Sequence, residues 1–102
     1  AVLIRAVEPI KGLDQIKINR KIKSKKTEDL TNGPGKLCQA LGIDKTFNGY
    51  NLIAGKQLHI IDFQEEKNYE IESGPRINID YAQEYTHVPW RFFMKDNPYL
   101  SR

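Results

Sequence analysis

The stretch LTNGPGKLCQALGI, residues 30–43, carries the clearest folding signal in the chain. Three apolar residues in it fall on one face of a helix: Leu37, Ala40 and Leu41. Gly42 is a natural place for that helix to end, and Thr31 or Asn32 is expected to cap its start. The stretch therefore predicts a short helix with one buried face.

The start of this helix, NGPGK at residues 32–36, also fits a ligand. Glycines let backbone N–H groups approach a ligand closely, and a helix N-terminus favours an anion. Lys36 in the first turn opposes the helix dipole, and a bound phosphate explains its position more easily than helix stability does. The spacing is not that of a Walker A loop, and a tight turn before a helix explains the same residues without a ligand.

The chain upstream of this helix predicts a strand, a helix and a loop. AVLIRAV, residues 1–7, is typical of a buried strand, and Pro9 ends it because proline has no N–H for the ladder. The apolar spacing over residues 13–22, with Asp14 in the first turn, predicts a helix. Residues 23–29 are polar and predict a loop.

Arg5 interrupts the predicted first strand. A guanidinium within an apolar strand is costly unless it is paired. Arg5 either forms a structural ion pair, for which Glu8 is the candidate, or points into a functional site. Its position alone favours neither interpretation.

The chain downstream predicts mainly strands. Alternation or β-branched residues indicate strands over residues 56–63, 76–80 and 88–94, the last broken by a proline. The remaining segments are an irregular loop with a short helical turn, residues 47–52, and a charged connection, residues 65–72. Trp90, Phe92 and Phe93 are expected to pack in the core, with stacking on nucleic-acid bases as the alternative. The order predicts one α+β domain over residues 1–102, with short helices and a mixed, largely antiparallel sheet.

Composition excludes several classes of protein. The 102 residues are enough for one domain, and the hydrophobic share of 39% is near the globular average. No apolar run approaches the roughly 18 residues of a membrane helix. Cys38, the one cysteine, allows no internal disulfide and is expected to be a buried thiol in a reducing compartment. Because the apolar run is already under way at Ala1, we expect the chain to be a piece of a longer domain.

Basic residues are concentrated in the first half. Residues 1–50 hold ten Lys and Arg against five Asp and Glu, whereas residues 51–102 hold six against eight. The excess peaks in KINRKIKSKK, residues 17–26. Such asymmetry predicts a polyanion facing this half, and a solvated helix face followed by a loop is the alternative.

The residues by themselves show no enzyme signature. The motifs GxSxG and HExxH are absent, and one cysteine with two histidines cannot build a Cys/His zinc site. His59 fits a strand and His87 fits a loop. No carboxylate stands out as a general base.

Five segments taken together resemble the C-terminal half of the alkyladenine (3-methyladenine, or methylpurine) DNA glycosylases: AVLIRAVEPIKG, NGPGKLCQALGID, PRINIDYA, PWRFF and NPYLSR. The resemblance implies a single mixed α/β domain of roughly twice this length. Members of the family flip a damaged purine out of double-stranded DNA, and water hydrolyses its N-glycosidic bond without a metal or cofactor. The resemblance also implies a monomer when full length, no membrane association, and a cytoplasmic, nucleoid-associated location in a bacterium.

The resemblance assigns roles to particular residues. Arg5 and the backbone carbonyl of Ile77 match positions that hold the attacking water, and Leu3 and Asn78 match the base pocket. The matched DNA-binding residues are Gly33, Pro34, Gly35, Lys36 and Lys45. The family's catalytic glutamate and the residues that sandwich the base have no match, so we expect the chain alone to be inactive. A non-catalytic basic nucleic-acid-binding module is the alternative function.

Two positions depart from the family pattern. The family usually has glycine where Asn78 stands, which changes the expected pocket shape, although asparagine tolerates unusual backbone angles. Asn51 replaces a common aspartate and is expected to matter only for local capping.

Overall fold

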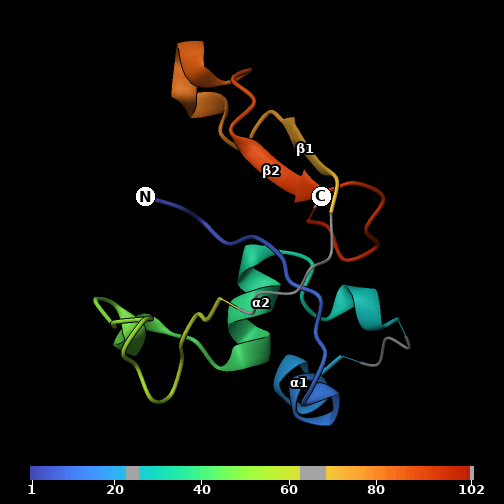
Figure 1. Cartoon of the computed structure of the whole chain (residues 1–102), viewed down its shortest axis with the longest axis vertical. Helices are drawn as coiled ribbons and strands as arrows, with labels where there is room; N and C mark the ends of the chain where they lie inside the picture. Colours follow the sequence, from blue (N-terminus) through green and yellow to red (C-terminus); the bar gives the residue numbers. More distant parts are fainter. Residues whose placement is uncertain (23–25, 63–68, 102) are drawn as a thin grey trace.

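The computed structural model describes residues 1–22, 26–62 and 69–101 and shows an α+β fold (Figure 1). The elements follow in the order α1 (Leu13–Arg20), η1 (Thr27–Asp29), α2 (Pro34–Leu41), η2 (Lys45–Phe47), β1 (Ile71–Gly74), η3 (Asp80–Tyr85) and β2 (Arg91–Met94), where η marks a 3₁₀ helix. The two α-helices lie toward one end of the longest axis, and η3 lies at the other (Figure 1). The α+β class predicted from the sequence is confirmed.

Backbone geometry sets the ends of both α-helices. α1 begins after Gly12, at φ 75°, and ends at Lys21, at φ 53°, both in the left-handed region. α2 ends at Gly42, at φ 67°, as predicted, and the Ile43 N–H closes this end by donating to a carbonyl of the last turn at 2.8 Å. Pro34 lies in the first turn, where its missing N–H costs no helical hydrogen bond.

The predicted cap of α2 by Thr31 or Asn32 is wrong. Gly33 is the residue before the helix, and no side chain bonds to the helix start. The buried Thr31 hydroxyl instead donates to the Val7 carbonyl at 2.7 Å, and this bond holds the N-terminal segment against the turn before α2. The Asn32 side chain accepts a hydrogen bond from Lys36.

The core of the described residues lies where α1 packs on α2. Ile16, Leu30 and Ala40 are buried together, and Leu13 and Ile22 pack partly buried against them. Burial of apolar area from water drives this packing. The helix predicted over residues 13–22 is therefore confirmed, although it ends earlier.

α2 buries a narrower face than predicted. Leu37 and Ala40 are buried, but Leu41 is 46% exposed. Leu41 is the last residue of the helix, and α1 covers only one stripe of α2 because two helices meet along a narrow line. Cys38 is half-buried rather than buried.

Two polar side chains fasten α1 to its neighbours. Asn19 donates to the Ala40 carbonyl at 2.9 Å. The Arg20 guanidinium donates from Nε to the Leu30 carbonyl at 3.1 Å and from Nη1 to the Gln39 side chain. Arg20 therefore contributes to the fold, although it belongs to the basic run for which the sequence left open a polyanion partner or a solvated helix face.

β1 and β2 pair antiparallel, and η3 lies in the connection between them (Figure 1). The register pairs Ile71 with Met94 and Gly74 with Arg91. β1 falls within and beyond the segment predicted as a charged connection, because its pairing with β2 is a long-range contact that the local pattern does not contain. β2 is shorter than the predicted strand of residues 88–94, since Pro89 has no N–H for a ladder.

The expected core packing of the β2 aromatics is wrong for two of them. Trp90 is 53% and Phe92 is 70% exposed, whereas Phe93 is half-buried beneath the Arg91 guanidinium. No described element packs over the face that carries Phe92. The antiparallel pair of β1 and β2, called the hairpin from here on, therefore leaves a large apolar surface in contact with solvent.

The predicted first strand, residues 1–7, is not a strand. This segment pairs with neither β1 nor β2, and Val2, Leu3 and Ile4 are exposed. A strand needs a neighbour along its whole length; here the backbone N–H and carbonyl of Val7 bond to Thr31, and no ladder with a described strand continues this contact. The segment has the apolar side chains of a buried strand, but no described element packs over Val2, Leu3 and Ile4.

Two further predicted strands are also wrong. Residues 56–62 form no strand, and the Ile60 N–H donates to the Leu52 carbonyl within the same loop at 2.8 Å; Phe63 lies outside the described residues. Over residues 76–80, Asn78 at φ 56° interrupts the extended backbone that a strand requires.

Leu30 is fully buried at the centre of the core, so Leu30→Ala should lower the free energy of unfolding by roughly 2–5 kcal/mol. Urea unfolding followed by circular dichroism measures this change. Ile53→Ala is the matched control, since Ile53 is 89% exposed, and its effect should stay within about 0.5 kcal/mol. Equal effects of the two substitutions would contradict the location of the core.

Candidate functional site

A groove of about 1130 Å³ runs between the N-terminal segment and the hairpin. Its walls are residues 1–8 on one side, β2 with the residue before it, and parts of residues 69–81 and 97–101. Most of the lining side chains are aliphatic or aromatic. We call this the N-terminal groove.

Three of the residues that the resemblance singled out line the N-terminal groove together: Leu3, Arg5 and Ile77. Asn78 follows Ile77 directly and is exposed. Its φ of 56° lies in the left-handed region, which explains why glycine is common in the family at this position and why asparagine is tolerated.

Arg5 bonds to the other end of the chain. Its Nε donates to the Ser101 hydroxyl at 3.0 Å, and Ser101 is buried. The partner that the structure gives Arg5 is therefore Ser101 and not the Glu8 considered from the sequence. Nothing in the local pattern around Ser101 identifies it, because the contact joins residues at opposite ends of the chain.

A stack of three side chains at the hairpin end was also missed by the sequence analysis. The Tyr85 and Trp90 rings are stacked with centroids 5.6 Å apart, and the Arg76 guanidinium lies 5.1 Å from the Trp90 ring centre. Stacking and cation–π contacts of this kind hold polar and aromatic groups in place at a surface. The PWRF segment, residues 89–92, could have indicated this stack, but the sequence analysis placed its tryptophan, Trp90, in the core.

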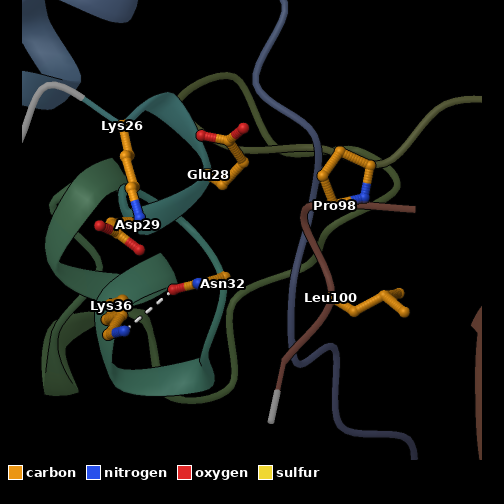
Figure 2. A pocket seen from close by; sticks show the side chains of 7 residues that line it. All are labelled: Lys26, Glu28, Asp29, Asn32, Lys36, Pro98 and Leu100. Atoms are coloured by element: carbon orange, nitrogen blue, oxygen red, sulfur yellow. Dashed lines mark hydrogen bonds between the residues drawn. The ribbon is translucent and has the colours of Figure 1, made fainter. Parts of the chain in front are cut away.

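The start of α2 faces a second, smaller hollow of about 420 Å³ (Figure 2). Its lining residues are Lys26, Glu28, Asp29, Asn32, Lys36, Pro98 and Leu100. Figure 2 shows Lys36 reaching back to Asn32, where its Nζ donates to the amide oxygen at 2.9 Å. Lys36 is exposed, and this bond is to a neutral group, so its charge remains able to meet an anion.

The glycine-rich turn leaves the start of α2 open. Gly35 is exposed, and a Cβ added there would meet no atom within 4 Å. No side chain caps the helix start, so its first N–H groups keep no side-chain acceptor. Gly33, Pro34, Gly35 and Lys36 therefore form one accessible edge.

Lys45 lies in η2, at the far end of α2 from Lys36. Asp44 holds this short helix because its Oδ1 accepts from both the backbone N–H and the hydroxyl of Thr46. These two hydrogen bonds lower the pKa of Asp44, the hydroxyl bond most. Asn51 plays a capping role in the next turn, as expected, since its side-chain oxygen accepts from the N–H groups of Ile53 and Ala54.

The structure thus divides the candidate residues into two regions. Leu3, Arg5 and Ile77 converge in the N-terminal groove, whereas the α2 start and Lys45 lie outside it. Within residues 1–22, 26–62 and 69–101, no three His, Cys, Asp or Glu side chains gather where they could hold a metal ion. No helix in that part of the chain is both long enough and apolar enough to cross a membrane.

The open helix start with the exposed Lys36 and the apolar groove that carries Arg5 are the two candidate regions of the described chain. The chain belongs to the methylpurine-DNA glycosylase family, a family of DNA repair enzymes, because the family model described as Methylpurine-DNA glycosylase (MPG) matches residues 1–98. The resemblance found in the sequence is confirmed.

Curated relatives agree with this assignment. A relative from Natranaerobius thermophilus is 52% identical over 101 residues, and relatives from Bacillus cereus and Bacillus thuringiensis are 49% and 48% identical over 109 residues. All three are named as 3-methyladenine DNA glycosylases. The alignments cover 99% of this chain but 51% to 53% of the relatives. The chain therefore spans about half the length of the curated relatives it matches.

Replacing Thr46 by valine removes the hydroxyl bond that lowers the Asp44 pKa most. We expect the pKa of Asp44 to rise toward its ordinary value of 3.8, and NMR titration of the carboxyl group measures it. A lowered folded-state pKa stabilises the fold above the unfolded pKa, and this stabilisation is lost as the pH falls through the folded pKa. Thr46→Ser keeps the hydroxyl and serves as control; a pKa that is the same in both variants would contradict the assignment.

Proposed function

We propose that the chain forms part of a monofunctional glycosylase that removes alkylated or deaminated purines from double-stranded DNA. One observation carries the proposal: Arg5 and Ile77, far apart in the sequence, line one groove together with Leu3. The resemblance assigns the Arg5 side chain and the Ile77 carbonyl to the same water molecule. Their convergence in the N-terminal groove supports that shared role.

In the proposed reaction, a damaged purine flips out of the duplex and enters the pocket. The oxygen of a water molecule bonds to the sugar carbon while the bond to the purine nitrogen breaks, and the purine leaves with the bonding electron pair. A general base accepts the water proton. In the family that base is a glutamate, which the resemblance places outside this chain.

Arg5 is suited to hold the water. Its Nε bond to the buried Ser101 fixes the side chain, and a guanidinium has further donors on its two Nη atoms. One of these donates to the water while the Ile77 carbonyl accepts from it. The two contacts orient the oxygen lone pair toward the sugar carbon.

The α2 start and Lys45 are proposed to contact the DNA backbone. Lys36 is exposed and bonded to a neutral amide, and the open turn at Gly35 allows a phosphate to approach the helix N-terminus. Phosphate contacts of this kind position a protein on DNA without reading its sequence. A bacterial protein of this kind works on the nucleoid in the cytoplasm.

The test joins the chain to the part of the Natranaerobius thermophilus relative that the chain does not span. The joined protein should release hypoxanthine or 3-methyladenine from duplex DNA in single-turnover assays, whereas the chain alone should release neither. Arg5→Ala in the joined protein should slow base release by about 10²-fold or more, because a positioning donor is lost. The affinity of this variant for undamaged duplex DNA should equal that of the unsubstituted joined protein.

Lys36→Ala in the same joined protein is the matched comparison. It should weaken binding to undamaged duplex and reduce the salt slope of binding by about one, because one phosphate contact is lost. If Arg5→Ala loses affinity in proportion and keeps its rate of base release, Arg5 is a backbone contact and the catalytic proposal fails. A joined protein that binds DNA and releases no base would favour a non-catalytic binding module.

A further inference from the structure

We propose that Arg91 is a positioning residue that acts through the backbone of residues 75–77. Its side chain holds the Pro75 carbonyl, and this contact sets the direction of the Ile77 carbonyl two residues further along the chain. The inference rests on the proposed function, because that function assigns the Ile77 carbonyl to the attacking water. The resemblance gives Arg91 no role in the reaction.

The hydrogen bond from Arg91 joins β2 to the chain that leaves β1. Arg91 is the first residue of β2 and pairs in register with Gly74, the last residue of β1. Its Nε donates to the carbonyl of Pro75, the next residue, at 3.0 Å. The side chain of Arg91 therefore continues the contact between the two strands to the residue that follows β1.

The Phe93 ring restricts the movement of the Arg91 guanidinium. Side chains two residues apart lie on the same face of a strand, and the Arg91 guanidinium lies 4.5 Å from the centre of the Phe93 ring. A cation over the face of an aromatic ring is attracted to it. The side chain also passes over Gly74, where a Cβ would be in van der Waals contact with Arg91 Nη2 at 3.5 Å. The ring contact and the Nε bond together hold the guanidinium in one orientation.

Ile77 lies between two residues whose backbone is constrained. The proline ring restricts φ of Pro75, and Asn78 has a φ of 56°, in the left-handed region. Among the described residues, no N–H or hydroxyl donates to the Ile77 carbonyl, which leaves it able to accept from a water molecule. The bond from Arg91 holds this segment at the point where it leaves β1.

A small movement of this segment is expected to change the rate of base release. The direction of a carbonyl depends on the backbone dihedral angles beside it, so a turn of the chain at Pro75 redirects the Ile77 carbonyl. Misplacement of a reacting group by about 1 Å can cost about 10²-fold in rate. The proposed contacts with the DNA backbone lie elsewhere, at the α2 start and Lys45, so binding of undamaged DNA should not depend on Arg91.

Two substitutions of Arg91 in the joined protein test the proposal. Arg91→Lys keeps the charge but loses the Nε donor, since lysine has donors at its tip alone. Arg91→Met loses the charge as well. Both should slow single-turnover base release by about tenfold or more, with affinity for undamaged duplex within about twofold of the unsubstituted protein. A normal rate in Arg91→Lys with a slow Arg91→Met would show that the charge matters and would overturn the proposal.

Lys95→Met is the matched control on the same hairpin. Lys95 follows β2 directly and forms an exposed ion pair with Glu70 at 3.5 Å. Exposed pairs of this kind contribute little to stability, so the rate should stay within about twofold. Equal slowing by Lys95→Met and Arg91→Lys would mean that general weakening of the hairpin is the cause, and the positioning role would be wrong.

The pH dependence of base release separates position from charge. Arg91→Met should lower the maximal rate and leave the pH of half-maximal rate unchanged, because the water is displaced while the general base keeps its surroundings. A shifted pH profile would mean that Arg91 acts on the general base through its charge, which contradicts the proposal.

Phe93→Leu tests the same role without removing the donor, and it decides the question if the Arg91 variants do not fold. Loss of the ring beneath the guanidinium should slow base release by about threefold with unchanged affinity for DNA; an unchanged rate would overturn the proposal. Arg5→Ala is measured alongside. A slow Arg5→Ala with normal rates in the Arg91 and Phe93 variants overturns this inference alone, whereas a normal rate in Arg5→Ala overturns the proposed function and the inference with it.

Discussion

The packing of Ile16 against Leu30 and Ala40 is the contact on which the rest of the described structure depends. Leu30 leads directly into Thr31, whose hydroxyl holds the Val7 carbonyl and so places the segment that carries Arg5. Ala40 belongs to α2, whose other end presents the glycine-rich turn. One small apolar cluster, fastened by hydrogen bonds from α1, therefore positions both candidate regions.

The two regions differ in how complete they are. The edge formed by Gly33, Pro34, Gly35 and Lys36 consists of consecutive residues at one helix start, so all of it lies within the chain. The N-terminal groove is formed by residues from both ends of the chain, and the hydrogen bond from Arg5 to Ser101 links those ends. Several apolar side chains of this groove are exposed, and the buried Nε of Arg76 has no hydrogen-bond partner among the described residues. The chain covers 51% to 53% of its curated relatives, and the glutamate of the proposed reaction is expected in the part that it does not span.

Local signals in the sequence predicted local structure well. The α-helices were found because apolar spacing and Gly42 act within a few residues. Most of the predicted strands were wrong, because strand pairing depends on distant partners that the periodicity of the sequence does not show. Residues 1–7 have the apolar pattern of a strand but pair with no described strand, whereas β1 pairs with β2 although its sequence pattern is weak. The local pattern singled out Arg5 and the glycine-rich turn with Lys36, whereas the remaining candidates, Leu3, Lys45, Ile77 and Asn78, came from the resemblance. The sequence analysis missed the contacts of Ser101 with Arg5 and of Arg76 with Trp90, because each joins residues that are far apart in the sequence.

Hydrogen exchange at the backbone of residues 2–6 tests most directly the proposal that the groove holding Arg5 and Ile77 is completed by the part of the family's domain that this chain does not span. These amides belong to an extended segment without a strand partner among the described residues. In the chain alone they should exchange quickly, and the added part of the Natranaerobius thermophilus relative should slow them by about tenfold or more, while amides of the loop around Ile53 stay unchanged. Exchange at residues 2–6 that is already slow in the chain alone, or that the added polypeptide leaves unaltered, would contradict the account.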